Sequence, residues 1–248
     1  MKNYVFMLML LIPSLLAKAQ RKTEQHKAPL NDNQIIIGYA DQYEVLPKLK
    51  FTKATSRQYD QLVQKNSWTK PKLKLLKGYF SIRTREGKQR FKQYSDGGAG
   101  KGWNGYELLG YSSLLNLYAL TANSTAEGIG FATLFLLDAK NGFRYHIASF
   151  GDWHVSLPQP SPKQRFVVYY SNTEYKHKNS DLGVLSFNPK AGKGKIFSLF
   201  ASLHSDEFAI AQIRWANDTT LYVKGYQEIY EHQKWVKKYG YYKVEISQ

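Results

Sequence analysis

The residues that first suggest chemistry are Asp152 and His154, in the stretch SFGDWHVSLP (149–158). They are two positions apart, so on an extended chain their side chains point to the same side. A carboxylate beside an imidazole can exchange a proton or begin a metal site. A polar loop with Trp153 packed inward explains the same residues without chemistry. The histidines, at positions 26, 146, 154, 177, 204 and 232, lack the spacing of a metal site, which favours the loop.

Two further places carry residue types that hydrolases use. Glu127, in TAEGIGF, is a single carboxylate, whereas glycoside hydrolysis needs two. The run HSD (204–206) places three triad types side by side, but triad members converge from separate segments, so we predict a turn there. The chain has no cysteine, which excludes thiol catalysis and thiolate metal sites. A hydrolase built on Asp152, His154 and Glu127 is therefore an alternative, and we predict neither a metal nor another cofactor.

Aromatic side chains near loops are stronger candidates for a site, and such a site would bind rather than catalyse. Tyr and Trp are favoured at interfaces, and loops on a rigid scaffold collect binding residues. The candidates in or beside loops are Trp103, Tyr106, Trp153, Tyr175 and Trp235. Each of them can instead be a core or strand-edge residue, and the sequence leaves this choice open.

The first 19 residues have the layout of a secretory signal peptide. Lys2 precedes an apolar run over residues 4–16, which is followed by the small-x-small signature AKA (17–19). The run is short for a membrane span, which needs about 20 residues, although an uncleaved anchor stays an alternative. We therefore predict an exported chain of 229 residues after cleavage, periplasmic or extracellular, with no integral membrane span.

The net charge narrows the choice of partner. The formal charge is +16, and residues 1–19 hold two lysines and no acid, so the exported chain keeps +14. Basic proteins attract polyanions. Nucleic acid is the least accessible polyanion outside the cell, which leaves an anionic glycan or an envelope protein. The lysines are spread along the chain, so the basic surface of a soluble monomer explains the same charge.

Residues 20–77 are expected to form a polar leader and a short helix. The helix candidate is KATSRQYDQLVQKN (53–66), with Thr55 or Ser56 as its N-cap. Pro71 prevents the helix from continuing.

From residue 78 to 248 the pattern is that of an all-β chain. Residues 79–84 alternate between two faces and lead into a Glu86-Gly87 hairpin turn. Ten further segments rich in Tyr, Phe and β-branched residues follow, separated by turn-forming residues. No long helical pattern separates them, so we expect antiparallel meanders.

The strand pattern repeats with a period near 50 residues. Asn123 and Asn172, each at a strand end, are 49 positions apart, and Asp138 and Asn188 are 50 apart. Blades of about 40–50 residues are the size of β-propeller repeats. We place the units near residues 106–160, 161–214 and 215–248.

The stretches SPKQRFVVYYSN (161–172) and WANDTTLYVKG (215–225) resemble the turn-plus-strand element of WD40-like and TolB-type propeller repeats. The resemblance implies antiparallel meander blades in a partial or degenerate propeller, with the turns at 161–164 and 216–219 joining one blade to the next. An open β-sandwich built from similar meanders is the alternative. The motif order LGY, LNLYAL, LLD, SPK and VVYYSN also resembles an exported bacterial protein family of unknown function, which implies a fold and no activity.

Together these features predict an exported, non-catalytic, β-rich binding or interaction module of the cell envelope. The signal peptide, the repeat and the basic aromatic loops support this prediction. The alternatives are a hydrolase acting on an extracellular polymer, and a secreted inhibitor or structural protein.

Overall fold

The computed structural model describes residues 32–38, 40–63, 65–98, 102–149, 155–172 and 178–246. All of them belong to one compact unit, Asn31–Gln248. Strands dominate this unit, and its described helices are α1 (Ala40–Val45) and α2 (Ser56–Asp60). The predicted signal peptide, residues 1–19, lies outside the described residues. Within the described part of the chain, no helix is long and apolar enough to cross a membrane.

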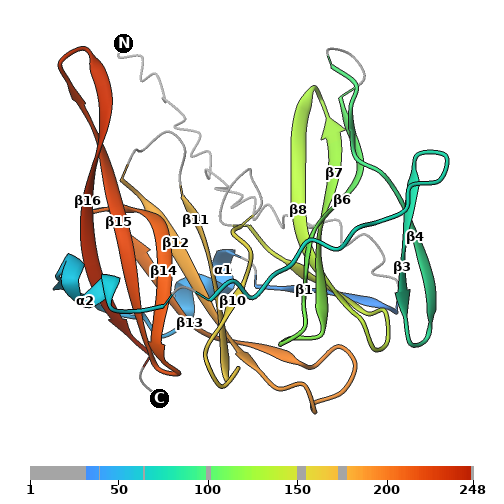
Figure 1. Ribbon diagram of the computed structural model, residues 1–248, viewed down its shortest axis with the longest axis horizontal. Coiled ribbons are helices and arrows are strands. Elements are labelled where there is room, and N and C mark those ends of the chain that lie inside the picture. The colour runs from blue at the N-terminus through green and yellow to red at the C-terminus, as the bar shows by residue number, and fades with distance from the viewer. Residues whose placement is uncertain are drawn as a thin grey trace, which may run out of the picture. The chain divides into compact units, whose positions relative to one another are not determined.

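The described strands form four open sheets (Figure 1). The six-stranded sheet has the order β1 (Gln34–Ile37), β9 (Arg144–Ile147), β8 (Ile129–Asp138), β7 (Leu117–Ala126), β6 (Trp103–Ser112) and β5 (Ser95–Asp96). The central sheet contains β10 (Gln159–Pro160), β11 (Phe166–Asn172), β12 (Ser180–Phe187) and β13 (Phe197–Ser205). The C-terminal sheet contains β14 (Ala209–Asn217), β15 (Thr220–Glu231), β16 (Lys234–Glu245) and β2 (Phe51–Ala54). The fourth is the hairpin of β3 (Tyr79–Thr84) and β4 (Gly87–Lys92).

Antiparallel pairing prevails in these sheets, and among the described strands β1 and β9 form the one parallel pair. This confirms the expected β-rich, antiparallel chain with a short helix near its N-terminal end. The predicted hairpin is also confirmed, but its two turn residues are Arg85 and Glu86 rather than Glu86 and Gly87, because Gly87 begins β4 and pairs with Thr84.

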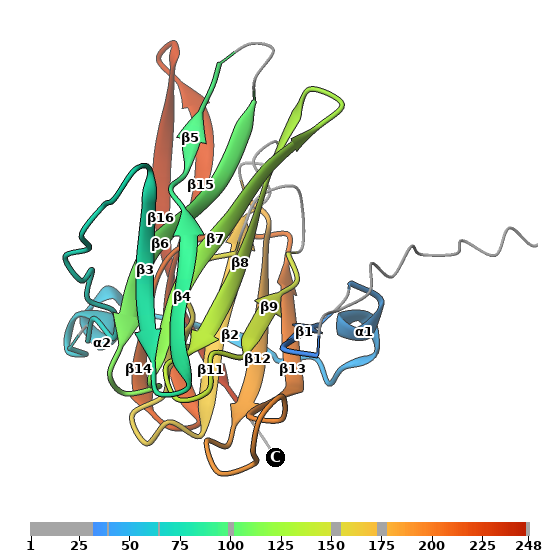
Figure 2. The same ribbon diagram turned by 90° about the vertical axis from the view of Figure 1, so that its right-hand side faces the viewer.

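Strands in the middle of the structure bury both of their faces. Leu136 of β8 belongs to the apolar cluster between the six-stranded and central sheets, whereas its neighbour Phe135 packs under the β3–β4 hairpin. Likewise Val167 of β11 packs toward the six-stranded sheet and Val168 toward the C-terminal sheet. Successive side chains of a strand point to opposite faces, so each middle sheet is shared by two clusters. Figure 2 views the resulting stack through the β3–β4 hairpin, with the β15–β16 hairpin behind it.

Two strands from the N-terminal part of the chain add to the edges of sheets that later residues form. β2 pairs with β16, with Phe51 opposite Val244, and β1 pairs with β9, with Ile37 opposite Ile147. Each covers a strand edge that would otherwise present unpaired N–H and C=O groups. Only four residues long, β2 carries no pattern that a sequence-based assignment could recognise.

The helix predicted over residues 53–66 is shorter in the structure. α2 begins after Thr55, whose Oγ1 accepts the Gln58 N–H at 3.2 Å, while the Thr55 N–H donates to Gln58 Oε1 at 2.9 Å. This capping box confirms Thr55 as the N-cap. The helix is shorter than predicted, because α2 ends at Asp60, where the Tyr59 carbonyl oxygen accepts the Leu62 N–H at 3.1 Å and also Arg214 Nη1 at 3.2 Å.

The turns at 161–164 and 216–219 lie within sheets. β10 and β11 pair across the first turn, with Pro160 opposite Val167, and β14 and β15 pair across the second. The expectation that these turns join one unit to the next is therefore wrong. The described link from the central to the C-terminal sheet is the short segment 206–208 instead.

His146, on β9, is a half-buried imidazole at the edge of two packed layers. Its ring stacks on Phe135 with centroids 5.2 Å apart, and its Nε2 lies 3.2 Å from Gln34 Oε1. Burial, and secondarily the charge of Arg144, lower the pKa of His146 from 6.5 to about 4. The folded protein therefore binds a proton on His146 less tightly than the unfolded chain does.

We expect acid to destabilise the protein through His146. Because the pKa is lowered on folding, this stability is present above 6.5 and is lost as the pH falls toward 4. Between pH of about 7.5 and about 5 the loss is about 2 kcal/mol. Urea unfolding at both pH values measures it, and His146→Gln should remove this component of the pH dependence. An unchanged pH dependence in the variant would contradict the assignment.

Candidate functional site

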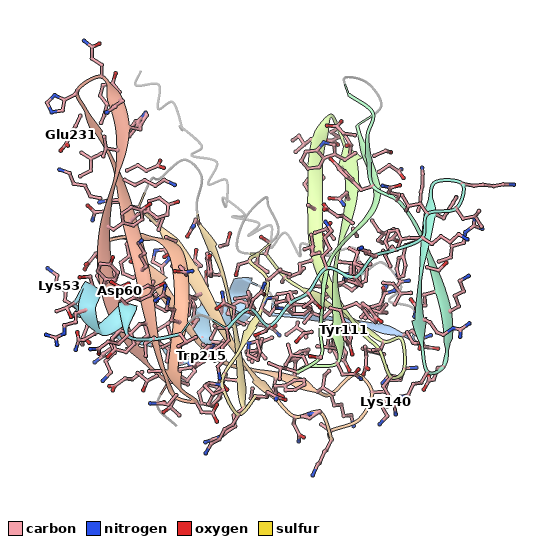
Figure 3. All side chains as sticks on the ribbon, in the orientation of Figure 1. Lys53, Asp60, Tyr111, Lys140, Trp215 and Glu231 are labelled. Atoms are coloured by element: carbon pink, nitrogen blue, oxygen red, sulfur yellow. The ribbon has the colours of Figure 1, made fainter. Side chains whose placement is uncertain are left out.

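The β15–β16 hairpin extends beyond the strands that flank it. β14 pairs with β15 only as far as Tyr226, and β2 pairs with β16 only from Tyr241 onward. Between these points, no other described strand pairs with the hairpin, and Figures 1 and 2 show it projecting from its sheet. We call residues 226–239 the arm. Glu231, at the end of β15, marks its tip in Figure 3.

A tight turn holds the two strands of the arm in register. His232 has a φ of 50° and Gln233 a φ of 63°. Two successive residues in this left-handed region are typical of a two-residue hairpin turn whose twist matches that of the strands. Pairing continues along the arm without a shift, so alternate side chains share a face. One face carries Tyr226, Glu228, Tyr230, Trp235, Lys237 and Tyr239.

Four of the six side chains on this face are aromatic, and three of these are exposed. The exposed fraction is 60% for Tyr230, 56% for Trp235 and 52% for Tyr239. The rings of Tyr230 and Trp235 meet edge-on with centroids 5.4 Å apart, and those of Tyr226 and Tyr239 are 6.4 Å apart. Cross-strand aromatic pairs stabilise a β-ribbon. The arm therefore presents three exposed aromatic rings on one face.

Lysines border the aromatic face. Lys237 Nζ lies 4.2 Å from the centre of the Tyr226 ring, and Lys224 Nζ lies 4.4 Å from that of Tyr239. Lys237 Nζ is also 3.5 Å from Glu228 Oε1. Exposed ion pairs contribute roughly 0–1 kcal/mol, so these ammonium groups can reorient toward an anionic partner at little cost. The arm therefore offers aromatic rings and lysine ammonium groups on one surface.

Two other predicted binding residues, Trp103 and Tyr106, lie on β6 of the six-stranded sheet. The Trp103 ring covers Gly130, where a Cβ atom would lie 2.6 Å from Trp103 Cε3, so a glycine is required at that point. Tyr106 packs against Phe91 with centroids 5.3 Å apart. Both side chains are half-buried and contribute to packing. Of the described binding candidates, Trp235 alone belongs to the arm.

Glu127 occupies the turn between β7 and β8. Its φ is 52° and that of Gly128 is 80°, and the Glu127 side chain is exposed. The remaining candidates, which lie outside the described residues, are Asp152, Trp153, His154 and Tyr175. The hydrolase built on Asp152, His154 and Glu127 therefore stays a prediction. Among the described residues, no group of three or more His, Asp or Glu side chains is placed to hold a metal ion.

The sequence predicts a turn at the HSD run (204–206), but His204 and Ser205 are the last two residues of β13, and the bend begins only at Asp206. Ser205 Oγ accepts the backbone N–H groups of Glu207 and Phe208, at 3.1 and 3.3 Å. A serine hydroxyl used in this way shapes the backbone of a turn. Ser205 is therefore architectural.

His204 is held between two carboxylates. Its Nδ1 lies 2.7 Å from Asp181 Oδ1, and its Nε2 lies 3.4 Å from Asp206 Oδ1. The hydrogen bond to Asp181 is the main cause that raises the pKa of His204 above its ordinary value. Asp181 faces His204 across β12 and β13, from 23 positions earlier in the chain, so no local motif reveals this pair.

A cavity of about 270 Å³ borders His204, and Ser202 supplies a hydroxyl to its wall. Ser202 Oγ donates to the carbonyl oxygen of Tyr43 at 3.1 Å and accepts from Lys48 Nζ at 3.0 Å. This hydroxyl is therefore engaged with groups other than the imidazole. The two carboxylates favour the protonated form of His204, and the described contacts of the cluster give no serine that His204 would activate as a nucleophile.

Comparison with protein-family models, with curated proteins and with solved structures gave no match to this chain. A functional assignment therefore has to come from the side chains themselves. Among the described surfaces, the arm combines the largest set of exposed aromatic rings with adjacent charge.

We expect His204 to stabilise the fold mainly at low pH. Its pKa is raised on folding, so its contribution is fully present below the ordinary value of 6.5 and is lost as the pH rises through the folded pKa. The side chain is 53% exposed, so we expect His204→Asn to cost about 0.5 kcal/mol at pH 5.5 and less at pH 8.5. Chemical unfolding measures both values. Asp181→Asn is the matched variant, and equal losses at the two pH values would refute the ion pair.

Proposed function

We propose that the protein is an exported, non-catalytic binding module of the cell envelope whose arm binds an anionic glycan. The observation that carries this proposal is the single face shared by Tyr226, Tyr230, Trp235 and Tyr239, with lysines beside it. The arm is held by backbone pairing and by its own cross-strand rings. It thus presents its rings at low conformational cost.

An anionic glycan fits both properties of this face. Tyr and Trp rings offer a broad apolar surface with a polar tip, which suits the alternation of C–H and hydroxyl groups on a sugar. Acidic groups along the polymer would pair with Lys237, Lys224 and the other lysines of an exported chain whose formal charge is +14. An envelope protein is the alternative partner, because aromatic residues are also enriched in protein interfaces.

For the architecture, we propose a partial propeller in which β6–β9, β10–β13, and β14–β16 with β2 are blades. In support, Asp138 and Asn188 occupy equivalent turns, each between the third and the fourth strand of its blade. Asp138 Oδ1 accepts the N–H of Lys140 at 2.7 Å, and Asn188 Oδ1 accepts that of Lys190 at 3.1 Å. An open β-sandwich of stacked meanders is the alternative architecture, and it leaves the arm and its face unchanged.

We expect the variant Tyr230→Ala/Trp235→Ala to lose binding to polygalacturonate, an acidic polysaccharide. Removing two exposed rings should weaken binding about tenfold or more, because aromatic anchors supply much of the free energy at such surfaces. Affinity electrophoresis with polygalacturonate and with neutral dextran measures the effect. Binding of the parent protein should also fall with added salt.

The matched control is Phe131→Ala, since Phe131 is a 38% exposed aromatic residue on β8, away from the arm. It should bind polygalacturonate like the parent protein. Equal binding by the arm variant, or an absence of binding by the parent, would refute the glycan assignment. If the arm variant instead loses one defined protein from an envelope extract, the partner is a protein.

The export part of the proposal has its own test. Expression of the full chain in a Gram-negative host should yield a periplasmic or released product that begins at Gln20, because the AKA signature at 17–19 is a cleavage site. Intact-mass measurement identifies the first residue. Replacement of Ala19 by a bulky residue, Ala19→Leu, should block cleavage. Recovery of a full-length chain in the cytoplasm would contradict export.

A further inference from the structure

Residues 65–76 run without helix or strand of their own from the end of α2 to the β3–β4 hairpin (Figure 1), and we call them the strap. The strap is fixed at two points. Trp68 is buried between the six-stranded and central sheets, and its Nε1 donates to the carbonyl oxygen of Pro158 at 2.7 Å. Thr69 exchanges both backbone hydrogen bonds with Tyr111, at 2.9 and 2.7 Å. The strap is therefore a fixed wall.

The beginning of the strap and the residues just before it enclose a cavity of about 470 Å³. Its other walls are the edge strands β10 and β14 and the turn between β6 and β7. Small-molecule sites typically have volumes of about 300–1,000 Å³ and mostly apolar walls. The apolar wall residues include Leu62, Leu114, Pro160, Pro162 and Ile213.

The polar part of the wall is positively charged. Arg214 and Lys65 line the cavity, and no Asp or Glu is among its described lining residues. The closest described carboxylate to the guanidinium is that of Asp60, at 4.0 Å from Arg214 Nη1, and 65% of the Asp60 side chain is exposed. That distance and exposure make the ion pair weak. Arg214 Nη1 donates to the carbonyl oxygens of Tyr59 and Leu62, at 3.2 and 3.0 Å, so an anion would have to bind the other N–H groups of the guanidinium.

Two N–H donors at this wall lack an acceptor among the described residues. They are Arg214 Nε and Trp215 Nε1, and both atoms are closed to solvent. Figure 3 shows Trp215 on β14 beside the course of the chain that leads into the strap. A buried donor without an acceptor costs free energy. An acceptor brought by a ligand would recover this free energy once the side chains rotate toward the cavity.

We propose that this cavity binds a small organic carboxylate with an apolar body. The carboxylate would accept hydrogen bonds from Arg214 and Trp215, and the body would lie against Leu62, Pro160 and Ile213. A guanidinium binds a carboxylate through charge-assisted hydrogen bonds. The apolar lining disfavours a small, fully hydrated anion such as inorganic phosphate. The site is independent of the arm, because its walls share no residue with residues 226–239.

The test uses phenylacetate as the probe and 2-phenylethanol as its neutral counterpart, with isothermal titration calorimetry of the full exported chain. Phenylacetate should bind in a 1:1 ratio, and the alcohol at least about tenfold more weakly. Arg214→Gln should weaken phenylacetate binding about tenfold or more while leaving the alcohol unaffected. Trp215→Phe should weaken phenylacetate binding by a smaller factor, because it removes one donor and keeps the ring.

The controls separate this site from other effects. Arg83→Gln removes an exposed arginine on β3, and Tyr230→Ala/Trp235→Ala changes the arm; both should bind phenylacetate like the parent protein. Arg214 also contacts α2, so a second variant is needed in case Arg214→Gln does not fold. Leu114→Trp, at the rim of the cavity, is that variant, because its larger side chain fills the cavity and should prevent phenylacetate binding. No saturable binding at about 10 mM phenylacetate, or unchanged affinity in the folded cavity variants, would overturn the proposal.

Discussion

The structure depends on strands that bury both faces and so belong to two apolar clusters at once. In β8 and β11 neighbouring side chains alternate between clusters, as Phe135 and Leu136 do. Because each fully buried side chain of this size contributes roughly 1.5–3 kcal/mol, the shared strands couple the packing of successive sheets. A chain without cysteine has no disulfide to replace this coupling. Because of this coupling, a polar substitution in β8 or β11 lies next to two packed layers of the structure.

Open sheets leave edges, and the chain covers them with segments from its N-terminal part. β1 and β2 pair with the last strands of two sheets, and the strap pairs with Tyr111 at the edge of β6. The structure has two surfaces suited to binding, and the strap forms part of one of them. Inside, it walls a cavity with Arg214 and Trp215. Away from the strap, the β15–β16 hairpin extends beyond its neighbouring strands and exposes Tyr230, Trp235 and Tyr239 on one face.

Local pattern was enough for the longer strands and for one helix start, but not for the four-residue β2. Alternation and turn residues predicted the β3–β4 hairpin, and the side chain of Thr55 fixed the N-cap of α2. The length of α2 was not predictable, because Arg214, far away in the sequence, supplies the contact at its end. Trp235 was a candidate on its aromatic type, but its grouping with three tyrosines depends on the register of β15 and β16. The cavity could not be predicted, since its walls come from four separate segments.

The sequence by itself determined the local properties of this protein: a β-rich chain, its basic charge and the strand segments, because these depend on residue type and on periods of a few positions. The tertiary structure alone decided which strand edges are covered, where the turns at 161–164 and 216–219 lie, and which residues meet as Asp181 and His204 do. These features depend on contacts between residues that are distant in sequence. Their free energy comes from packing and pairing, which no local pattern records.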